Sequence, residues 1–330
     1  MAEFLTFDTD LTAVANAIRV KGGTSAQLIY PSGFVSAIQA IQTGITPKLV
    51  VTTTPGAAIT ATPAEGFKVV KGTAGADGMC TLELPKAGTW HVTAMANSVS
   101  NSQHIVIGTQ NMLLPLYHDT FANNTWEEII TVCRTGIAPD SWAVGDSKTM
   151  NIGGTAYQVD IIGKNHDEYA DGSGTAPLTF QLHDCYSEAK QMYDTNLSGL
   201  GWKNTDMRLT YLPAILALMP AEVQNGIHAV NKKTSEGGNS TTIETVSDTL
   251  FLLSEVEIFG TASSSVAGEG SQYDYYKAGN PKIKKREGVD EFWWERSSAS
   301  GGMFCRVRAN GQAGASNASS SLGVSFAFCF

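Results

Sequence analysis

The chain has 330 residues, of which 42% are hydrophobic and 16% are charged, so it can fill two or three domain cores and has an unusually uncharged surface. The net charge of −9, from 22 basic and 31 acidic residues, excludes an electrostatic nucleic-acid binder, because such proteins need a basic field to release counterions. Five cysteines without CxxC spacing exclude a zinc ribbon and favour buried, reduced thiols. No metal ion or cofactor is expected.

The N-terminal sequence MAEFLTFDTD has neither the basic nor the apolar region of a signal peptide. The longest apolar stretches, such as Leu212–Met219, are far shorter than the ~20 residues that cross a bilayer. We therefore expect a protein that is made in the cytoplasm and does not insert into a membrane. It would leave the cell only by another route, such as lysis.

Residues 1–45 are expected to form a helical attachment module. Leu11, Val14 and Ile18 recur at helical spacing, with Asp10 placed as the N-cap and Gly22 as the stop. A helix this short buries its apolar face only against a neighbour. The pattern therefore predicts a homo-oligomer, for example a trimer, that assembles through this module.

A second helix is expected between Pro31 and Gly44, with Phe34, Ile38 and Ile41 on one face. The whole stretch reads LTAVANAIRVKGGTSAQLIYPSGFVSAIQAI. It resembles a short module of tail and structural proteins of phages that infect Gram-positive bacteria. The resemblance implies a virion location and other tail proteins as partners.

Residues 46–109 are expected to form a small β-sandwich, because short β-prone runs alternate with Pro-Gly, Glu-Gly, Asp-Gly and Ala-Gly turns. The run GMCTLELPKAGTWHVTA resembles the end of bacterial immunoglobulin-like or carboxypeptidase-regulatory-like domains, which implies a spacer with Trp90 in its core. The expected strands are Lys48–Thr54, Ala57–Thr62, Phe67–Val70, Cys80–Leu84, Thr89–Ala96 and His104–Ile107.

Residues 110–330 are expected to form one large α+β domain. Its first helix would be capped by Asn124 or Thr125 and would turn Ile129, Ile130 and Cys133 inward. The expected elements are a helix over Trp126–Arg134, a hairpin of Ser147–Ile152 and Thr155–Ile162 around Gly153-Gly154 with inward Ala156 and Val159, a strand over Thr179–His183, helices over Met207–Met219 and Pro220–Ala229, a strand over Leu250–Leu253, and a turn over Glu255–Phe259.

Three groups of residues are candidate chemical sites. His183-Asp184-Cys185 are neighbours on a strand and point to opposite faces, so a surface pair beside a buried thiol is preferred to a catalytic set. The acidic loop Asn165–Gly172 lacks the spacing of a calcium loop, so a solvated loop is preferred. Lys282, Lys284, Lys285 and Arg286 precede acidic residues and are expected to form a solvated loop.

Cys305 and Cys329 lie 24 residues apart in strand-like, apolar runs. One interpretation is a reactive pair of the formylglycine-generating type, and the other is two small apolar residues in a sheet. Apolar flanks raise the pKa of a thiol and mute its reactivity, so the structural interpretation is preferred. Because no phosphate loop or nucleophile elbow is present either, the chain is expected not to be an enzyme.

The segment from Ser297 to Leu322 is the most unusual in the chain, since 18 of its 26 residues are Ser, Ala, Gly or Asn. It lies between the aromatic run Phe292-Trp293-Trp294 and the apolar run Gly323–Phe330, and Met303–Arg308 interrupts it with strand alternation. Small, varied side chains on a fixed scaffold are typical of recognition surfaces.

The frame FWWERSSASGGMFCRVRANGQAGASNASSSLGVSFAFCF resembles the closing pattern of a domain family of gut bacteria and their phages. LTFQLHDCY, LPAILALMPAEVQNGIHAVNKKT and TLFLLSEVEIFG resemble that family's body. The resemblance implies a C-type-lectin-like fold, and it extends to the variable proteins of diversity-generating retroelements, in which template adenines are randomised. A variable region of about residues 293–330 follows from it.

Carried over by position, the resemblance divides this region into frame and contact residues. Met303 and Gln312 are not easily reached from an Asn codon by changes at adenines, and the usual lectin calcium motifs are absent. The implied frame is Trp293, Trp294, Arg296, Ser297, Phe304, Val307, Gly311, Gly323, Val324, Phe326 and Phe328. The implied ligand-binding positions are Ala299, Gly301, Met303, Arg306, Arg308, Gln312, Ala313, Ala315 and Leu322, with Asn310, Ser316, Asn317, Ser319 and Ser321 as template-like residues.

These observations predict a phage receptor-binding protein, or adhesin, that contacts a host cell-surface protein or glycan. Arg306 and Arg308 alternate on one strand, so we expect them to share a face and to suit an acidic or glycan target. The alternatives are an enzyme related to formylglycine-generating proteins, which would need an exposed cysteine, and a bacterial surface adhesin without diversification.

Overall fold

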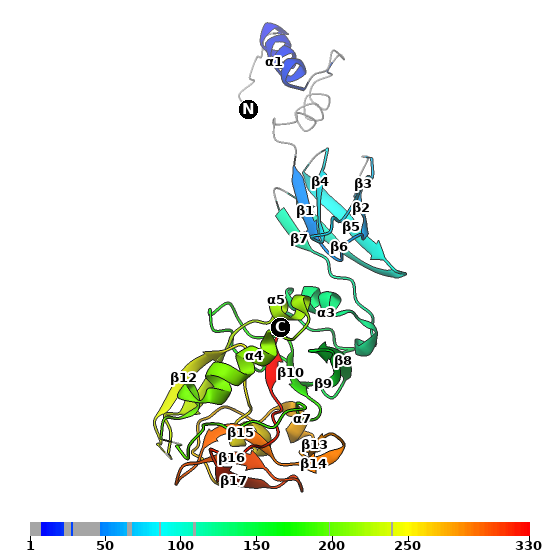
Figure 1. Cartoon of the computed structure of the whole chain (residues 1–330). Helices are drawn as coiled ribbons and strands as arrows, with labels where there is room; N and C mark the ends of the chain where they lie inside the picture. Colours follow the sequence, from blue (N-terminus) through cyan, green and yellow to red (C-terminus); the bar gives the residue numbers. More distant parts are fainter. Residues whose placement is uncertain are drawn as a thin grey trace. The chain divides into compact units, whose positions relative to one another are not determined.

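The computed structural model describes residues 8–22, 28, 47–64, 68–85, 87–107, 110–197, 199–238 and 240–330. The chain divides into two compact units, Met1–Leu114 and Pro115–Phe330 (Figure 1). The fold is mixed α+β and rich in strands, as predicted.

The first unit begins with helix α1, Asp8–Gly22. The helix ends at the predicted glycine, but it starts two residues before Asp10, so Asp10 lies inside the helix and is not its N-cap. Ile18 is buried as expected, whereas Val14 is 48% exposed. The second predicted helix, Pro31–Gly44, lies outside the described residues.

Among the described residues of this unit, seven strands follow α1 and form two sheets. One sheet has the order β4-β1-β7 and the other the order β3-β2-β5-β6. The strands are β1 Lys48–Thr52, β2 Ala58–Pro63, β3 Val70–Thr73, β4 Met79–Glu83, β5 Gly88–Ala96, β6 Val99–Ile107 and β7 Gln110–Leu113.

Alternating burial along these strands explains why two sheets form. Along β5 the residues Trp90, Val92 and Ala94 are buried while their neighbours are partly exposed, so one face of each strand supplies the core. The position of Trp90 in the core is as predicted. Three boundaries were wrong. Strand β3 begins at Val70, and β6 begins at Val99 and not at His104. Strand β7 extends the strands of this unit beyond residue 109, because it pairs in parallel with β1.

The second unit is built on a four-stranded antiparallel sheet with the order β18-β10-β9-β8. Gly153 and Gly154 have φ angles of 58° and 88°, which the tight turn between β8 and β9 requires and a side chain resists. This is the predicted hairpin, although Ala156 is exposed. The strands are β8 Ser147–Ile152, β9 Thr155–Gly163, β10 Thr179–Leu182 and β18 Ala327–Cys329.

Aromatic side chains pack around Phe180 in the centre of this sheet. The rings of Phe121, Trp126, Phe328 and Phe330 all have centroids within 6.0 Å of the Phe180 ring centroid. The two ends of the unit therefore share one core. In Figure 1 the red strand β18 accordingly lies beside the green strand β10.

Helix α3, Trp126–Cys133, covers part of this core. Thr125 caps it in a reciprocal capping box with Glu128, which satisfies two free backbone donors at the helix start. The predicted inward residues Ile129, Ile130 and Cys133 are all buried. Thr125, rather than Asn124, is therefore the cap.

The remaining predictions for this unit were partly wrong. Residues Leu250–Leu253 are buried but form only an isolated bridge, Phe251 with Ala327, and the predicted turn at Glu255–Phe259 is helix α6. The predicted helix over Met207–Met219 is a π turn, Met207–Tyr211, followed by α4, Leu212–Leu216. The other elements are η1 Phe121–Asn123, η2 Trp202–Asn204, α5 Ala221–Gly226, β11 Val230–Ser235, β12 Ile243–Asp248, α7 Asp274–Lys277, β13 Lys284–Arg286 and β14 Val289–Glu291.

A buried ion network joins four of these segments. Lys232 on β11 lies 2.6 Å from Asp167 and 2.7 Å from Glu257 on α6, and Glu257 accepts two hydrogen bonds from Arg296. Tyr273 also donates to Asp167. Burial alone would raise the pKa of Asp167, but the Lys232 ammonium group brings it below its ordinary value, so the network stays ionised.

Replacing Arg296 with Met is expected to destabilise the second unit by about 3–5 kcal/mol, because Glu257 would remain buried beside Lys232 with half of its charge compensation lost. Arg296→Lys should retain more stability than Arg296→Met but less than the wild type, since an ammonium group cannot form the two-pronged contact with Glu257. Urea unfolding of the full chain, followed by tryptophan fluorescence, measures the change. The exposed Arg134→Met is the matched control, and a similar stability for both variants would contradict the expectation.

Candidate ligand-binding surface

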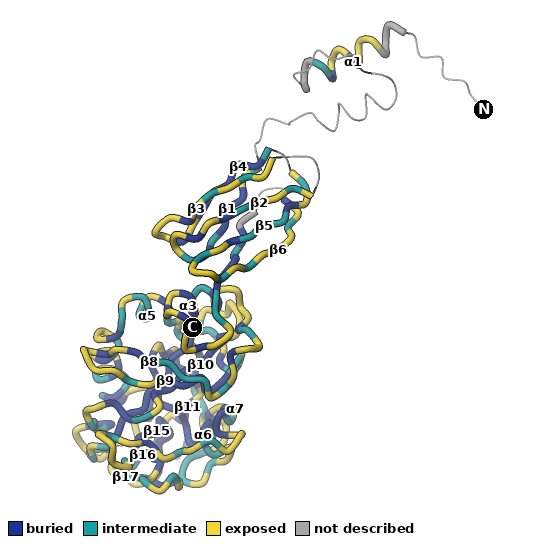
Figure 2. Tube along the Cα trace, turned by 90° about the vertical axis from the view of Figure 1, so that its right-hand side faces the viewer, coloured by how far each residue is buried: buried dark blue, intermediate teal, exposed yellow. Residues whose placement is uncertain are grey.

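The C-terminal segment forms a three-stranded antiparallel sheet with the order β15-β16-β17. The strands are β15 Trp293–Ser298, β16 Met303–Val307 and β17 Ala313–Asn317. All six residues of β15 are buried, whereas β17 at the edge is mostly half-exposed. Figure 2 shows this gradient as a change from dark blue on β15 to teal and yellow on β17.

Two tryptophans fix the inner strand. Trp293 and Trp294 are fully buried, and their indole nitrogens donate hydrogen bonds of 2.9 and 2.8 Å to the carbonyls of Lys282 and Lys190. Each ring therefore has both an apolar contact surface and a satisfied polar atom. The resemblance assigns both residues to the frame, and both are buried.

Gly323 is needed where the chain returns to this strand. It forms a parallel bridge with Trp293, and a Cβ there would lie 2.6 Å from Cys185 Sγ and 2.9 Å from Glu291 Cγ. No side chain fits in that space. Of the other implied frame residues, Gly311 is half-buried. The rest are buried: Arg296, Ser297, Phe304, Val307, Val324, Phe326 and Phe328.

Most of the implied ligand-binding positions are at least partly exposed. Arg308, Gln312 and Gly301 are exposed. The remaining half-buried positions are Met303, Arg306, Ala313, Ala315 and Leu322.

One implied position was wrong. Ala299 is only 2% exposed, and its amide donates to the carbonyl of Met303, so it belongs to the turn between β15 and β16 and not to the surface. A stretch of small residues gives no sign of which member points inward. Burial of Ala299 follows from its neighbours in the fold.

The exposed positions divide between two faces of the sheet. Met303, Ala313 and Ala315 share one face, because their cross-strand partners are Asn317, Val307 and Cys305 and side chains alternate along a strand. Arg306 lies opposite Gly314 and belongs to the other face.

Arg306 and Arg308 lie together, as expected from their alternation. A Cβ on Gly314 would lie 2.8 Å from Arg308 Nε, so the Arg308 side chain crosses the glycine that pairs with Arg306. Burial and the charge of Arg308 lower the pKa of Arg306. The Arg306 guanidinium lies 4.1 Å from the centre of the ring of Phe292, an exposed aromatic residue that the resemblance assigns to neither the frame nor the contact positions.

Beneath the sheet lies a cluster of buried carboxyl groups that the sequence analysis missed. Burial, and then the charges of Glu255 and Glu269, raise the pKa of Glu295 well above its ordinary value. Both carboxyl oxygens of Glu295 lack a hydrogen-bond partner among the described residues. An acidic residue inside the aromatic run FWWERSS was the only available signal.

The three residues His183, Asp184 and Cys185 form no catalytic set. His183 Nδ1 lies 2.7 Å from Asp160, Asp184 accepts the Lys285 amide, and Cys185 is buried. Burial raises the pKa of the Cys185 thiol to about 12. Each group is engaged with a different neighbour, which agrees with the preferred structural interpretation.

The acidic loop Asn165–Gly172 is not simply solvated. Asp167 is 3% exposed and belongs to the ion network, while Asp171 accepts hydrogen bonds from the amide and hydroxyl groups of Ser173. Among the described residues, no group of three or more His, Cys, Asp or Glu side chains is placed to hold a metal ion.

The basic cluster at residues 282–286 was also wrongly expected to be a solvated loop. Lys284 is 4% exposed and donates to the carbonyls of Leu182 and His183, and Arg286 pairs with Glu291 across the β13–β14 hairpin. Burial lowers the pKa of Lys284 to about 8. The cluster therefore has a structural role.

Cys305 and Cys329 are fully buried and unoxidised. Burial raises the pKa of both thiols, and nearby carboxyl groups raise it further. A nucleophilic cysteine needs the opposite, an accessible thiol with a lowered pKa. The geometry favours two small core residues.

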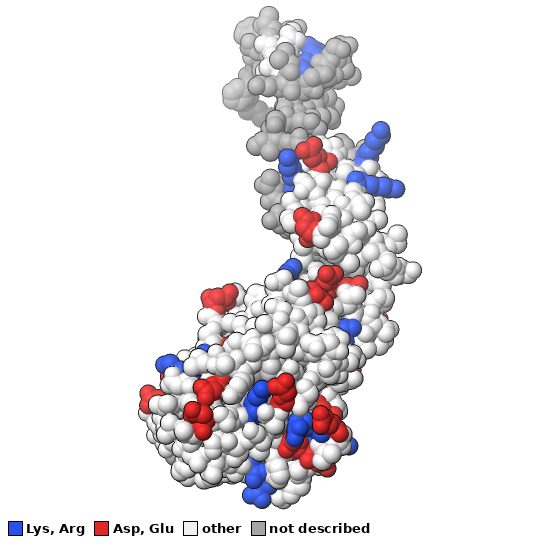
Figure 3. All heavy atoms as spheres, in the orientation of Figure 1, with Lys and Arg blue, Asp and Glu red and all other residues white. Residues whose placement is uncertain are grey.

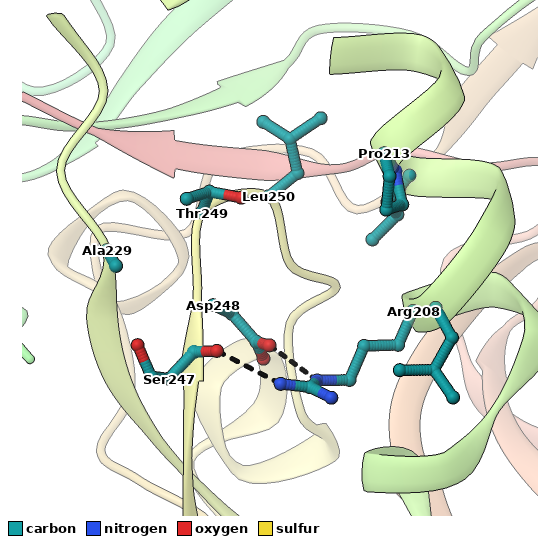
Figure 4. A pocket seen from close by; sticks show the side chains of 9 residues that line it. Arg208, Pro213, Ala229, Ser247, Asp248, Thr249 and Leu250 are labelled. Carbon is teal, nitrogen blue, oxygen red and sulfur yellow. Dashed lines mark hydrogen bonds and ion pairs between the residues drawn. The ribbon is translucent and has the colours of Figure 1, made fainter. Parts of the chain in front are cut away.

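A surface pocket of about 250 Å³ lies between the π turn, α4 and the end of β12. Arg208 reaches into it, but its guanidinium already donates to Asp248 and to the carbonyls of Ser247 and Lys203 (Figure 4). Asp248 also accepts from Trp202. Because both charged groups are used internally, the pocket offers little polar chemistry to a ligand.

Residues 179–330 match the model of a family described as a domain of unknown function, DUF6273. The match begins at β10 and includes the whole β15–β17 sheet. No curated protein and no solved structure matches the chain. No helix among the described residues is long and apolar enough to cross a membrane.

Glu295→Gln is expected to stabilise the protein increasingly as pH rises. A raised pKa means that the folded state keeps a proton which the unfolded state releases above pH ~4.5, so the wild type loses stability as pH increases toward the folded pKa. Glutamine carries no charge at any of these pH values. In thermal melts of the full chain at pH 5 and pH 8, the melting temperature of the variant should exceed that of the wild type by more at pH 8. The exposed Glu287→Gln is the control, and an equal gain at both pH values would disprove the assignment.

Proposed function

We propose that the chain is a non-enzymatic receptor-binding protein of a phage tail. Its second unit would be a C-type-lectin-like domain that attaches to a host cell-surface molecule through the outer strands β16 and β17. The observation that carries the proposal is the division of residues 293–330 by burial. Aromatic and glycine frame positions are buried or half-buried, and all but one of the implied contact positions are at least partly exposed.

This division is suited to recognition by a changing surface. Exposed substitutions away from caps and special backbone positions usually cost under ~0.5 kcal/mol, whereas the inner strand is held by buried tryptophans and an ion network. The outer side chains can therefore differ while the frame persists. The sheet would act as a rigid platform, as binding surfaces generally require.

The first unit suits the role of a connector in this proposal. Its two sheets would form an immunoglobulin-like spacer, and residues 1–45 would attach the protein to other tail proteins and assemble copies of it. Several copies on one tail raise the effective affinity of weak individual sites. The location would be the virion.

Fluorescently labelled full-length protein is expected to bind the surface of at least one strain in a panel of gut bacteria. Met303→Ala combined with Gln312→Ala should weaken binding at least severalfold without changing the melting temperature, because both side chains lie on the outer strands or their turn. Flow cytometry measures the binding. Lys71→Ala on β3 is a control, and equal binding by both variants would count against the proposed surface.

Diversification makes a separate prediction about the coding sequence. We expect a near-copy of the region encoding residues 293–330 beside a reverse-transcriptase gene, with differences confined to adenines of the template. Sequencing the surrounding genome tests this directly. If no such copy exists, the surface is that of an ordinary adhesin without diversification.

A further inference from the structure

The pair Arg306 and Arg308 is the least compensated charge on the second unit's C-terminal sheet. Neither guanidinium forms an ion pair with a described residue, although the chain carries a net charge of −9. The closest acidic residue in sequence, Glu295, is fully buried beneath the sheet. Glu291, which precedes Phe292, is already paired with Arg286 and accepts the Phe292 amide. Two like charges side by side are unfavourable for folding alone.

The hydrogen-bonding groups of both arginines remain largely available. Toward the described residues, Arg306 donates only from its Nε, to the Ala315 carbonyl, and the Arg308 side chain forms no hydrogen bond with any of them. The Phe292 ring supports the Arg306 guanidinium from one side, which restricts its motion before any ligand arrives. A guanidinium held in this way is prepared for two-pronged contact with an anion.

The surroundings of the pair are polar and uncharged. Asn310 and Gln312 are exposed in the adjoining turn, and Ser316 is half-exposed on the same face of the sheet. Figure 3 shows that the lower end of this unit is mostly white, with a small blue area. Amide and hydroxyl groups around a cationic centre suit a partner rich in hydroxyl groups, and the exposed Phe292 ring offers a flat apolar face to a sugar ring.

We propose that Arg306 and Arg308, with Phe292 beside them, form a binding site for an acidic glycan, a sugar chain that bears carboxylate or sulfate groups. The inference rests on the proposed receptor-binding function and names its ligand class. Each guanidinium engages an anionic group, the aromatic ring contacts the sugar face, and the neighbouring amides contact hydroxyl groups.

Binding of immobilised full-length protein to defined polymers tests this site. Hyaluronan supplies carboxylates, heparin supplies sulfates, dextran is neutral, and polyglutamate is acidic without sugar. We expect binding to hyaluronan or heparin that weakens with salt, with dextran and polyglutamate at least about tenfold weaker. Hyaluronan and heparin together distinguish which anionic group is preferred.

Arg306→Ala and Arg308→Ala are each expected to weaken glycan binding about tenfold, the scale of one lost charge-assisted hydrogen bond. The double variant should melt no lower than the wild type, because a repulsive pair is removed. Lys68→Ala combined with Lys71→Ala changes the net charge equally at exposed positions of the first unit and should leave binding unchanged.

The assignment is overturned by no binding to either acidic glycan, by unchanged binding of the double arginine variant, or by equal binding to polyglutamate. The last result would indicate an acidic protein as the partner. Bacterial-cell binding that depends on Met303 and Gln312 but not on the arginines would reject the glycan site and leave the receptor-binding function standing. If neither the Met303 and Gln312 variant nor the arginine variants weaken binding to cells, both the glycan site and the proposed receptor-binding surface are rejected.

Discussion

The structure of the second unit depends on four charges that are removed from water. Asp167, Lys232, Glu257 and Arg296 come from a loop, β11, α6 and β15, and they alternate in sign through contacts of 2.5 to 2.9 Å. Taking such groups out of water costs several kcal/mol per ion, which only close and fully hydrogen-bonded partners offset. The geometry therefore tolerates little displacement of any of the four segments.

This constraint explains why the C-terminal sheet has a rigid inner strand and a permissive outer one. Arg296 is anchored further by the carbonyls of Leu252, Lys233 and Glu269, so β15 is fixed from below. Strands β16 and β17 depend on β15 through backbone hydrogen bonds, which do not depend on the identity of the side chains. The partly exposed side chains of these two strands can therefore change without disturbing the register.

Local signals in the sequence predicted the elements that are stabilised locally. The capping residues of α3, the Gly-Gly turn between β8 and β9, and the alternation around Trp90 each concern residues close together in the chain. The division of the C-terminal segment into frame and surface came from a resemblance, since small residues such as Ala299 carry no periodic signal of their own.

The predictions failed where distant residues decide the environment. Asp167 and Lys284 looked like solvated charges because polar neighbours surround them in sequence, yet a lysine 65 residues away and two backbone carbonyls about 100 residues away take them into the core. The stretch Leu250–Leu253 has the composition of a strand, but its neighbours leave it only one bridge. Such outcomes depend on tertiary pairing, which propensity does not encode.

The placement of β18 has a consequence for how variants of this chain are made. The last strand pairs with β10 and bridges Phe251, and Phe326, Phe328 and Phe330 complete the aromatic core. This strand is translated after the outer strands β16 and β17. A frameshift or stop codon anywhere in residues 297–322 therefore deprives the nascent unit of its core, and the product is left to aggregation or proteolysis. The second unit can therefore complete its core only in chains whose reading frame is intact through residues 297–322.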